Sequence, residues 1–156
     1  MKFVVDGMLG KLAKWLKILG FDVLFFSNAG DDALLDIARR EGRTLLTRDL
    51  GLIARAKRLK SLSVQSEIWE EQVAQVLDHF QLRAEVRPFT RCLECNAPLK
   101  FIPKPDAANL VSPFVYERSQ TFAVCPSCGR VYWQGTHFTA MRAEIAKLLE
   151  KPAQPE

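Results

Sequence analysis

The sequence contains no apolar segment that approaches the ~20 residues needed to span a bilayer. Residues 1–6 carry one lysine, but neither the apolar stretch nor the small-residue cleavage site of a signal peptide follows them. Internal repeats and low-complexity segments are also missing. These absences argue against a transmembrane or exported chain, and we expect a cytoplasmic protein that does not bind membranes.

The composition is that of a compact protein with a small excess of positive charge. Of the 156 residues, 48% are hydrophobic and 26% are charged, which excludes a disordered or collagen-like polymer and indicates one domain, or one domain with a small appendage. The 22 basic and 18 acidic residues give a net charge of +4. This excess suits a phosphate-rich partner but does not identify one.

Strand-like and helix-like patterns alternate through residues 1–83. Apolar runs predict short strands at 3–5, 22–26, 44–47 and 62–64. Helical spacing predicts helices between and after these strands, and the first helix carries Leu9, Leu12, Ala13 and Leu16. Asp31 or Asp32 is the predicted N-cap of the second helix, and a basic helix is predicted at 52–60. This alternation is typical of an α/β fold, with a parallel sheet that has helices on both faces.

The second part of the chain, residues 84–150, has a different texture, with four cysteines and several prolines. Short strands are predicted at 114–116, 121–124 and 130–133. A terminal amphipathic helix is predicted from the apolar residues Met141, Ile145, Leu148 and Leu149. The tail at 151–156 holds two prolines and is predicted to fray.

The cysteines form two Cys-x-x-Cys pairs, Cys92 with Cys95 and Cys125 with Cys128. Each two-residue spacer lets both thiolates face one ion, and two such pairs complete a tetrahedral four-thiolate zinc site. Four thiolates leave no open position, so we expect a structural zinc in a small C-terminal zinc ribbon. A disulfide or redox pair is the alternative, but a chain without export signals occupies a reducing compartment.

Acidic residues stand at positions that favour a second kind of metal site. Asp6 follows the first predicted strand and Asp49 the third, and the carboxyl ends of parallel strands meet at one edge of a sheet. Asp31, with Asp32 beside it, opens the intervening helix. Clustered carboxylates favour hard Mg²⁺ or Mn²⁺ ions. Purely structural roles remain open, for Asp31 as a helix cap and for Asp6 as a turn residue.

Basic and aromatic residues accompany these sites. Lys11 and Lys14 lie on the helix that follows Asp6, and Lys11 is the nearer to the strand end, where it would hold a phosphate. Arg48 either binds a phosphate or pairs with Asp49. In the ribbon, we expect Tyr132 and Trp133 either to stack on unpaired bases or to pack beneath the zinc. His137 would touch phosphate, bond within the core or, less readily, ligate a metal.

Longer motifs resemble a known family. The N-terminal motif runs Asp6-Gly-Met-Leu-Gly-Lys-Leu-Ala-Lys-Trp-Leu-Lys17, and Arg43-Thr-Leu-Leu-Thr-Arg-Asp49 follows the Leu34-Leu35 helix. The two cysteine pairs come next, and the second leads into Gly129-Arg-Val-Tyr-Trp-x-Gly-Thr-His137. In this order the motifs resemble the PIN-like ribonuclease family named for the Mut-seven C-terminal domain, over about residues 2–142.

The resemblance implies a PIN-like nuclease domain at 1–83, a zinc ribbon with its helix at 84–150, and metal-dependent cleavage of RNA. Asp6, Asp31 and Asp49 match the family's acidic positions. PIN domains commonly use a fourth acidic residue, and no clear candidate follows the fourth strand, where Gln65, Ser66 and Glu67 stand. The prediction is an endoribonuclease. The alternatives are a non-catalytic RNA-binding or ribosome-associated module, and a toxin-like nuclease controlled by a protein partner.

Overall fold

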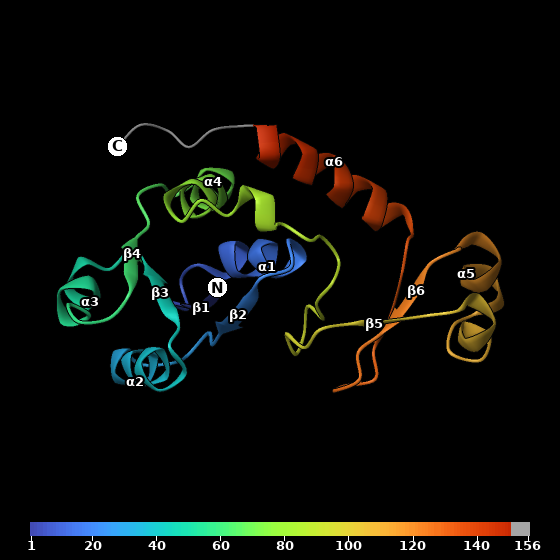
Figure 1. The fold of residues 1–156 in the computed structure, drawn as a ribbon, viewed down its shortest axis with the longest axis horizontal. Helices are drawn as coiled ribbons and strands as arrows, with labels where there is room; N and C mark the ends of the chain where they lie inside the picture. The colour runs from blue at the N-terminus through green and yellow to red at the C-terminus, as the bar shows by residue number, and fades with distance from the viewer. Residues whose placement is uncertain (151–156) are drawn as a thin grey trace.

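The computed structural model describes residues 1–150, so the predicted fraying of the tail at 151–156 lies outside the described residues. Strands and helices alternate along the N-terminal half of the chain (Figure 1). In chain order these elements are β1 (Lys2–Val5), α1 (Gly10–Ile18), β2 (Asp22–Phe25), α2 (Asp31–Glu41), β3 (Thr44–Thr47), α3 (Leu50–Arg55), β4 (Ser61–Ser63) and α4 (Trp69–His79).

The four N-terminal strands form a parallel sheet in the order β2-β1-β3-β4. Successive side chains of β1 point to opposite faces of this sheet. Phe3 and Val5 pack in one core with α1 and α4, while Val4 packs in another with α2 and α3. Helices therefore cover both faces, which confirms the predicted α/β class and explains why the central residues of each strand are apolar.

The ribbon, residues 92–133, contains a second and antiparallel sheet in the order β5-β6-β7. Its strands are β5 (Lys100–Ile102), β6 (Phe122–Val124) and β7 (Val131–Trp133); the 3₁₀-helix η2 (Lys104–Ala107) and helix α5 (Pro113–Arg118) connect β5 to β6. The predicted strand at 114–116 is wrong, because these residues lie in α5. Ser112 caps this helix by accepting a hydrogen bond from Val115 N–H, and Pro113 favours its first turn.

Two further helix boundaries differ from the predictions. The N-cap of α2 is Gly30, not Asp31 or Asp32 as predicted. No side chain therefore caps this helix. Both carboxylates lie in the first turn instead, where the helix dipole favours negative charge. Helix α3 begins after Asp49 and ends at Arg55, and is shorter than the helix predicted at 52–60.

The terminal helix α6 (Thr136–Glu150) returns from the ribbon to the N-terminal half and packs against α4 (Figure 1). Ile145 and Leu148 are buried in the core that α1 and α4 share. Arg83, in the 3₁₀-helix η1 (Arg83–Glu85), donates hydrogen bonds to the carbonyl oxygens of Leu148 and Leu149. The division of the chain into residues 1–83 and 84–150 stays a prediction. None of the helices within residues 1–150 is both long and apolar enough to cross a membrane.

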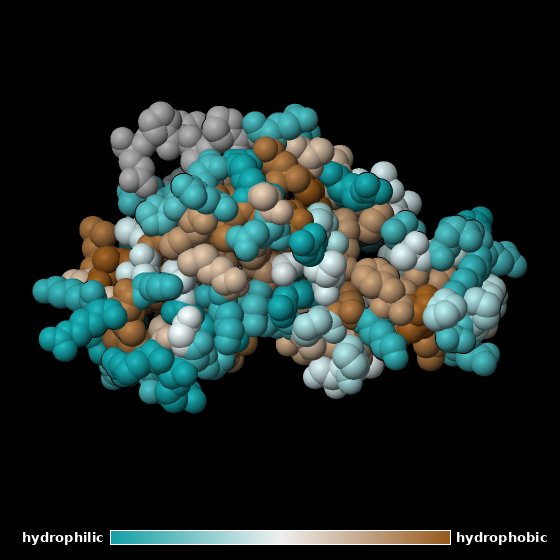
Figure 2. Space-filling model, in the orientation of Figure 1, coloured by the Kyte–Doolittle hydropathy of each residue, from teal (hydrophilic) through white to brown (hydrophobic). Residues whose placement is uncertain are grey.

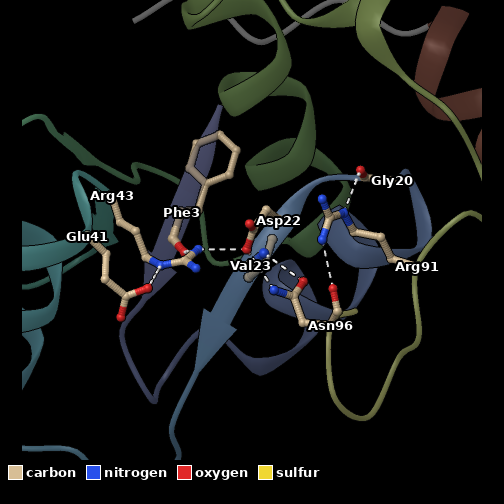
Figure 3. A network of polar contacts seen from close by, with 8 residues as sticks. All are labelled: Phe3, Gly20, Asp22, Val23, Glu41, Arg43, Arg91 and Asn96. Carbon is tan, nitrogen blue, oxygen red and sulfur yellow. Dashed lines mark hydrogen bonds and ion pairs between the residues drawn. The ribbon is translucent and has the colours of Figure 1, made fainter. Parts of the chain in front are cut away.

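The Asn96 clamp, formed by Asn96, Asp22, Val23 and Arg43, joins the ribbon to the edge strand β2 (Figure 3). Asn96 directly follows Cys95 and has a φ of 69°, a conformation that asparagine tolerates better than most residues. Its Oδ1 accepts a hydrogen bond from Val23 N–H at 2.9 Å, and its Nδ2 donates to Asp22 Oδ1 at 2.7 Å. The first cysteine pair is thereby fixed to the start of β2.

Arg43 completes the clamp from the other side of Asp22. Its guanidinium is 7% exposed and donates to Asp22 Oδ1 at 2.8 Å and to the Phe3 carbonyl oxygen at 3.1 Å. Burial acts to raise the pKa of Asp22, but the hydrogen bonds from Arg43 and Asn96 outweigh it, so the pKa is lower than usual. The clamp therefore holds Asp22 as a carboxylate.

Candidate active site and zinc centre

Thr47 connects the two aspartates that follow β1 and β3. Its side chain is fully buried, and its hydroxyl donates a hydrogen bond to Asp6 Oδ2 at 2.7 Å. The same hydroxyl oxygen accepts from Asp49 N–H at 3.0 Å. Asp6 N–H in turn donates to the Leu46 carbonyl oxygen of β3 at 3.0 Å. The structure thus brings Asp6 and Asp49 to one edge of the sheet, at the carboxyl ends of neighbouring strands.

Asp49 has a second contact that fixes its orientation. It is the N-cap of α3, and its Oδ1 accepts hydrogen bonds from Gly51 N–H at 2.8 Å and from Leu52 N–H at 3.2 Å. The side chain remains exposed, while Asp6 is half-buried. Sequence reasoning missed Thr47, although it occupies the predicted Thr-Arg-Asp motif, because a threonine in an apolar strand is also an ordinary strand residue.

Asp31 and Asp32 face a different partner. Arg55, in the last turn of α3, forms an ion pair with Asp31 at 3.8 Å and a closer one with Asp32. The loop that leads from β2 to these residues passes directly against the end of β1, because a Cβ on Gly7 would lie 2.7 Å from the Ser27 carbonyl oxygen. Asp31 therefore follows the same edge of the sheet but turns its carboxylate toward Arg55.

The three predicted carboxylates are not gathered around one point. Within residues 1–150, the four cysteines are the one group of three or more acidic, histidine or cysteine side chains whose ligand atoms all lie within 4.8 Å of one another. Asp6 and Asp49 are neighbours through Thr47, and Asp31 is held apart by Arg55. The assignment of these three residues as ligands stays a prediction.

Arg48 lies at the same edge and makes a contact that the sequence did not reveal. Its guanidinium pairs with Glu67 at 3.5 Å, whereas a pair with Asp49 was one of its predicted roles. Glu67 is 85% exposed and follows β4, the strand next to β3. An acidic residue after the fourth strand therefore does reach this edge, although no motif marks it.

The lysines of α1 divide into two kinds. Lys11 and Lys14 are exposed, as expected of phosphate-binding residues. Lys17, one turn further on, is half-buried, and its Nζ lies 3.4 Å from the Leu93 carbonyl oxygen of the ribbon. Burial lowers the pKa of Lys17 below its usual value. Helix α1 therefore connects the acidic edge to the ribbon.

The four cysteine sulfurs converge as a tetrahedral metal site requires. Cys92 Sγ lies 3.6 Å from Cys128 Sγ, and Cys95 Sγ lies 3.1 Å from Cys125 Sγ. A zinc ion with bonds of ~2.3 Å holds its sulfur ligands about 3.8 Å apart. Positive φ angles of 69° at Asn96 and 79° at Gly129 turn the chain after each pair. The four thiols and their spacing fit zinc. A zinc ion held by all four would have no open coordination position for a substrate.

Three thiols of this centre have shifted pKa values, and hydrogen bonds, first that from the backbone N–H of Arg130, lower the pKa of Cys128. Burial acts to raise the pKa of Cys92, but hydrogen bonds from the Tyr132 hydroxyl and from the backbone N–H groups of Cys95 and Glu94 outweigh it and lower the pKa to about 6. Burial raises the pKa of Cys125 to about 11. Cys92 and Cys128, one from each pair, thus offer a thiolate readily, and Cys125 gains most from the charge of a bound cation.

The predicted RNA-binding residues of the ribbon differ in their surroundings. The Tyr132 hydroxyl lies 3.1 Å from Cys92 Sγ and accepts a hydrogen bond from Leu93 N–H at 3.0 Å, which fixes its ring beside the zinc centre. Trp133 is 43% exposed. His137 is exposed in the first turn of α6 and is absent from the cysteine group. Trp133 and His137 are therefore accessible to a ligand.

Comparison with known proteins assigns the chain to a family. The Mut7-C RNAse domain family matches residues 1–145. The chain belongs to this family. A human protein called exonuclease mut-7 homolog is 36% identical over 101 residues, which cover 61% of this chain and 12% of the human protein. The chain thus spans a small part of that relative, and no solved structure matches it. Membership of the Mut7-C family supports a nuclease-type function with RNA as the substrate.

Proposed function

We propose that this Mut7-C domain is a cytoplasmic endoribonuclease that hydrolyses RNA phosphodiester bonds. Residues 1–83 form the cutting unit in this proposal, and residues 84–150, the zinc ribbon with its C-terminal helix, extend the RNA-binding surface. The observation that supports it most is the shared contact of Asp6 and Asp49 with the Thr47 hydroxyl. A reducing compartment is proposed because the four cysteines are free thiols, clustered at the spacing of a metal site, and not disulfides.

Asp6 and Asp49 are suited to hold Mg²⁺ or Mn²⁺ together. Each uses one carboxylate oxygen in the contacts described for residues 1–150, Oδ2 in Asp6 and Oδ1 in Asp49, so the second oxygen of each remains for a cation. Carboxylate oxygens are the ligands that these hard ions prefer. The bound ion would supply an activated water and neutralise charge on the phosphate.

Asp31 is proposed as the third carboxylate, in preference to Asp32. Arg55 approaches Asp32 more closely than Asp31, whose oxygen lies 3.8 Å from the guanidinium. If the Asp31 carboxylate rotates toward the edge of the sheet to bind a metal ion, Arg55 keeps its ion pair with Asp32. Both side chains are exposed, at 47% for Asp31 and 91% for Asp32, so this rotation meets no buried obstacle.

Basic residues would position the RNA along this edge. Lys11 is exposed in the first turn of α1, next to the strand end that carries Asp6, and Lys14 continues the same surface. Arg48 is 39% exposed, and its pair with Glu67 is weak enough for a phosphate to replace. Tyr132, Trp133 and His137 would extend the contact to unpaired bases and phosphates at the ribbon.

The test is cleavage of a circular single-stranded RNA, which only an endonuclease can open. Purified protein should cut it with Mg²⁺ or Mn²⁺ and should not cut it after chelation of these ions. The variant Asp49→Asn should lose cleavage while it keeps its fold, because asparagine is as good an N-cap for α3 as aspartate. Asp36→Asn is the matched control, since Asp36 is an exposed helical aspartate whose described ion pair is a local one with Arg40, four residues further along α2.

The outcomes separate the proposed function from its alternatives. Cleavage that persists in Asp49→Asn, with contaminating nucleases excluded, would contradict the assigned role of Asp49. RNA binding that is the same in both variants, with no cleavage under any metal, would indicate a non-catalytic RNA-binding module. Cleavage of linear but not circular RNA would replace the endonuclease by an exonuclease.

A further inference from the structure

A cavity of about 380 Å³ lies where the ribbon meets the start of α6. Its walls come from three parts of the chain that are distant in sequence: Ile18 at the end of α1, the ribbon strands, and Phe138 and Met141 of α6. On the face shown in Figure 2, hydrophobic residues are exposed in the region between α6 and the ribbon strands. This volume is within the range of sites that bind small organic molecules.

The register of the ribbon sheet explains the shape of this cavity. Phe101 of β5 pairs with Ala123 of β6, and Ala123 pairs with Tyr132 of β7. Residues paired in this way point to the same face, so two aromatic side chains flank one small residue. The outer strands are about 10 Å apart across β6. A methyl group in the middle leaves room for a flat ring between the aromatic side chains.

The two flanking rings are ready for stacking. Tyr132 is immobilised because its hydroxyl contacts Cys92 Sγ and Leu93 N–H. Phe101 is 56% exposed, a large exposed fraction for a phenylalanine that borders a cavity. A preorganised aromatic surface of this kind binds the face of any nucleobase without selecting its identity.

The polar groups of the cavity favour an anion. None of the lining residues is acidic, whereas Arg91 and His137 are among them. Arg91 donates its described hydrogen bonds to the backbone carbonyl oxygens of Gly20 and Asn96, and it interacts with the Asp22 carboxylate by charge attraction rather than by a described hydrogen bond. A second guanidinium, that of Arg142, lies 5.6 Å from the centre of the Phe138 ring. An aromatic slot with a cationic rim matches a base that carries a phosphate.

We propose that this cavity binds one unpaired nucleotide of the RNA, with its base between Phe101 and Tyr132 and its phosphate near Arg91. The proposal rests on the proposed RNA substrate but places a binding site away from the acidic edge. Helix α1 separates the two sites, since it begins four residues after Asp6 and ends at Ile18, which lines the cavity. Its nine residues span ~13 Å, the length of about four stacked nucleotides. A strand bound at both places would pass the exposed Lys11 and Lys14.

The test measures RNA affinity in a cleavage-deficient Asp49→Asn background, so that it does not depend on catalysis. A fluorescent single-stranded decanucleotide is titrated with the zinc-loaded protein, and AMP is titrated in parallel. Phe101→Leu keeps an apolar side chain but removes the stacking ring, and Ala123→Leu fills the slot with both rings present. The matched control is Phe114→Leu, since Phe114 is a ribbon phenylalanine of similar exposure, 62%, which borders Arg118 on α5 and not the cavity.

Phe101→Leu and Ala123→Leu should each weaken decanucleotide binding about tenfold, and Phe114→Leu should leave it unchanged. The dependence of affinity on salt should stay the same in all three variants, because no phosphate contact is removed. A decanucleotide that lacks all its bases should bind with the same affinity to the protein with the unaltered cavity and to the two cavity variants. AMP should bind at the cavity far more weakly than the decanucleotide, because it cannot reach Lys11 and Lys14.

Two results would overturn the proposal. One is equal affinity for Phe101→Leu, Ala123→Leu and Phe114→Leu, which would leave the cavity to another occupant, such as an apolar peptide segment. The other is tight binding of AMP with no gain from a longer strand, which would make it a site for free nucleotides. Zinc content and the unfolding midpoint of each variant show that a loss of affinity is not a loss of fold. Failure of the circular-RNA assay would leave these binding results unaffected.

Discussion

The substitution Asn96→Gly removes the side-chain hydrogen bonds that join the ribbon to the edge strand β2, while it preserves the local backbone conformation. Asn96 is 8% exposed and has a φ of 69°, a value that glycine adopts readily. Both hydrogen bonds of its side chain end on the first two residues of β2, at Asp22 and Val23. The cysteine ligands are not altered. The variant therefore tests whether the Asn96 clamp stabilises the parallel sheet.

The expected cost follows from the two lost hydrogen bonds. The neutral bond from Val23 N–H contributes about 1 kcal/mol, and the bond to the Asp22 carboxylate contributes ~1.5–3 kcal/mol. Glycine relieves the backbone strain of an asparagine at positive φ, by ~1 kcal/mol or less, but increases the entropy of the unfolded chain by a similar amount. These two effects cancel to first order. We expect the free energy of unfolding to fall by about 3 kcal/mol.

Urea unfolding of the zinc-loaded protein measures this change. Trp15 and Trp69 stack with ring centroids 4.7 Å apart and report on the packing of α1 against α4. The chain has three tryptophans, so a Trp133→Phe background leaves this pair as the fluorescent probe. Asn109→Gly is the control, since Asn109 is exposed and should change stability by less than ~0.5 kcal/mol. Equal stability of Asn96→Gly and Asn109→Gly would refute the stabilising role of the clamp.

Three further predictions concern the acidic edge, the clamp and the zinc. Thr47→Val should lower stability by about 2 kcal/mol, because the buried hydroxyl bonds the Asp6 carboxylate, and cleavage of RNA should fall more than RNA affinity. The folded-state pKa of Asp22 is lowered, so its stabilising contribution is complete above its unfolded value of about 3.8 and is lost as pH falls through the folded value. The difference in unfolding temperature between the unaltered protein and Asp22→Asn should therefore shrink toward zero as the pH is lowered from 7 to 3; a constant difference would contradict this. Removal of zinc by a thiol-selective chelator should unfold the ribbon, so the fluorescence of Trp133 should no longer show an unfolding transition on heating. It should also lower the unfolding temperature reported by Trp15 and Trp69.

Regular periodicity made most of the fold predictable. The apolar spacing of α1 and α4 follows the helical repeat, and their predicted apolar residues are buried in the structure, apart from the half-buried Phe80. The cysteine spacing predicted a four-sulfur cluster, which the structure contains. In contrast, Phe114, Val115 and Tyr116 have strand-forming side chains, yet the Ser112 cap and Pro113 place them in a helix. A local start signal therefore outweighed β propensity.

Contacts between residues that are distant in sequence could not be predicted from sequence patterns. Arg43 follows a glycine and precedes a strand, a position typical of an exposed residue, but it is 7% exposed and pairs with Asp22. Arg55 lies within the basic helix predicted at 52–60, but it forms ion pairs with Asp31 and Asp32. Arg48 reaches Glu67 rather than the adjacent Asp49. Each of these contacts joins residues from different elements or loops of the sheet domain, so it depends on the strand order and leaves no periodic trace in the sequence.

The zinc centre and the acidic edge lie at opposite ends of the same strands, which separates the effects of the two proposed metals. β1 and β2 are parallel and in register from Lys2 with Asp22 to Val5 with Phe25. The Asn96 clamp holds the first residues of β2, whereas Asp6 follows the last residue of β1, so about four residues, or ~13 Å, lie between them. Once the RNA is bound, zinc can therefore influence the cleavage step only through the stability of β2 and its neighbours, whereas its effect on RNA affinity acts through the ribbon. At saturating RNA, loss of cleavage after zinc removal should follow the unfolded fraction of the parallel sheet and recover on cooling. Loss of cleavage after Mg²⁺ or Mn²⁺ removal should be complete at every temperature, in a protein whose sheet remains folded.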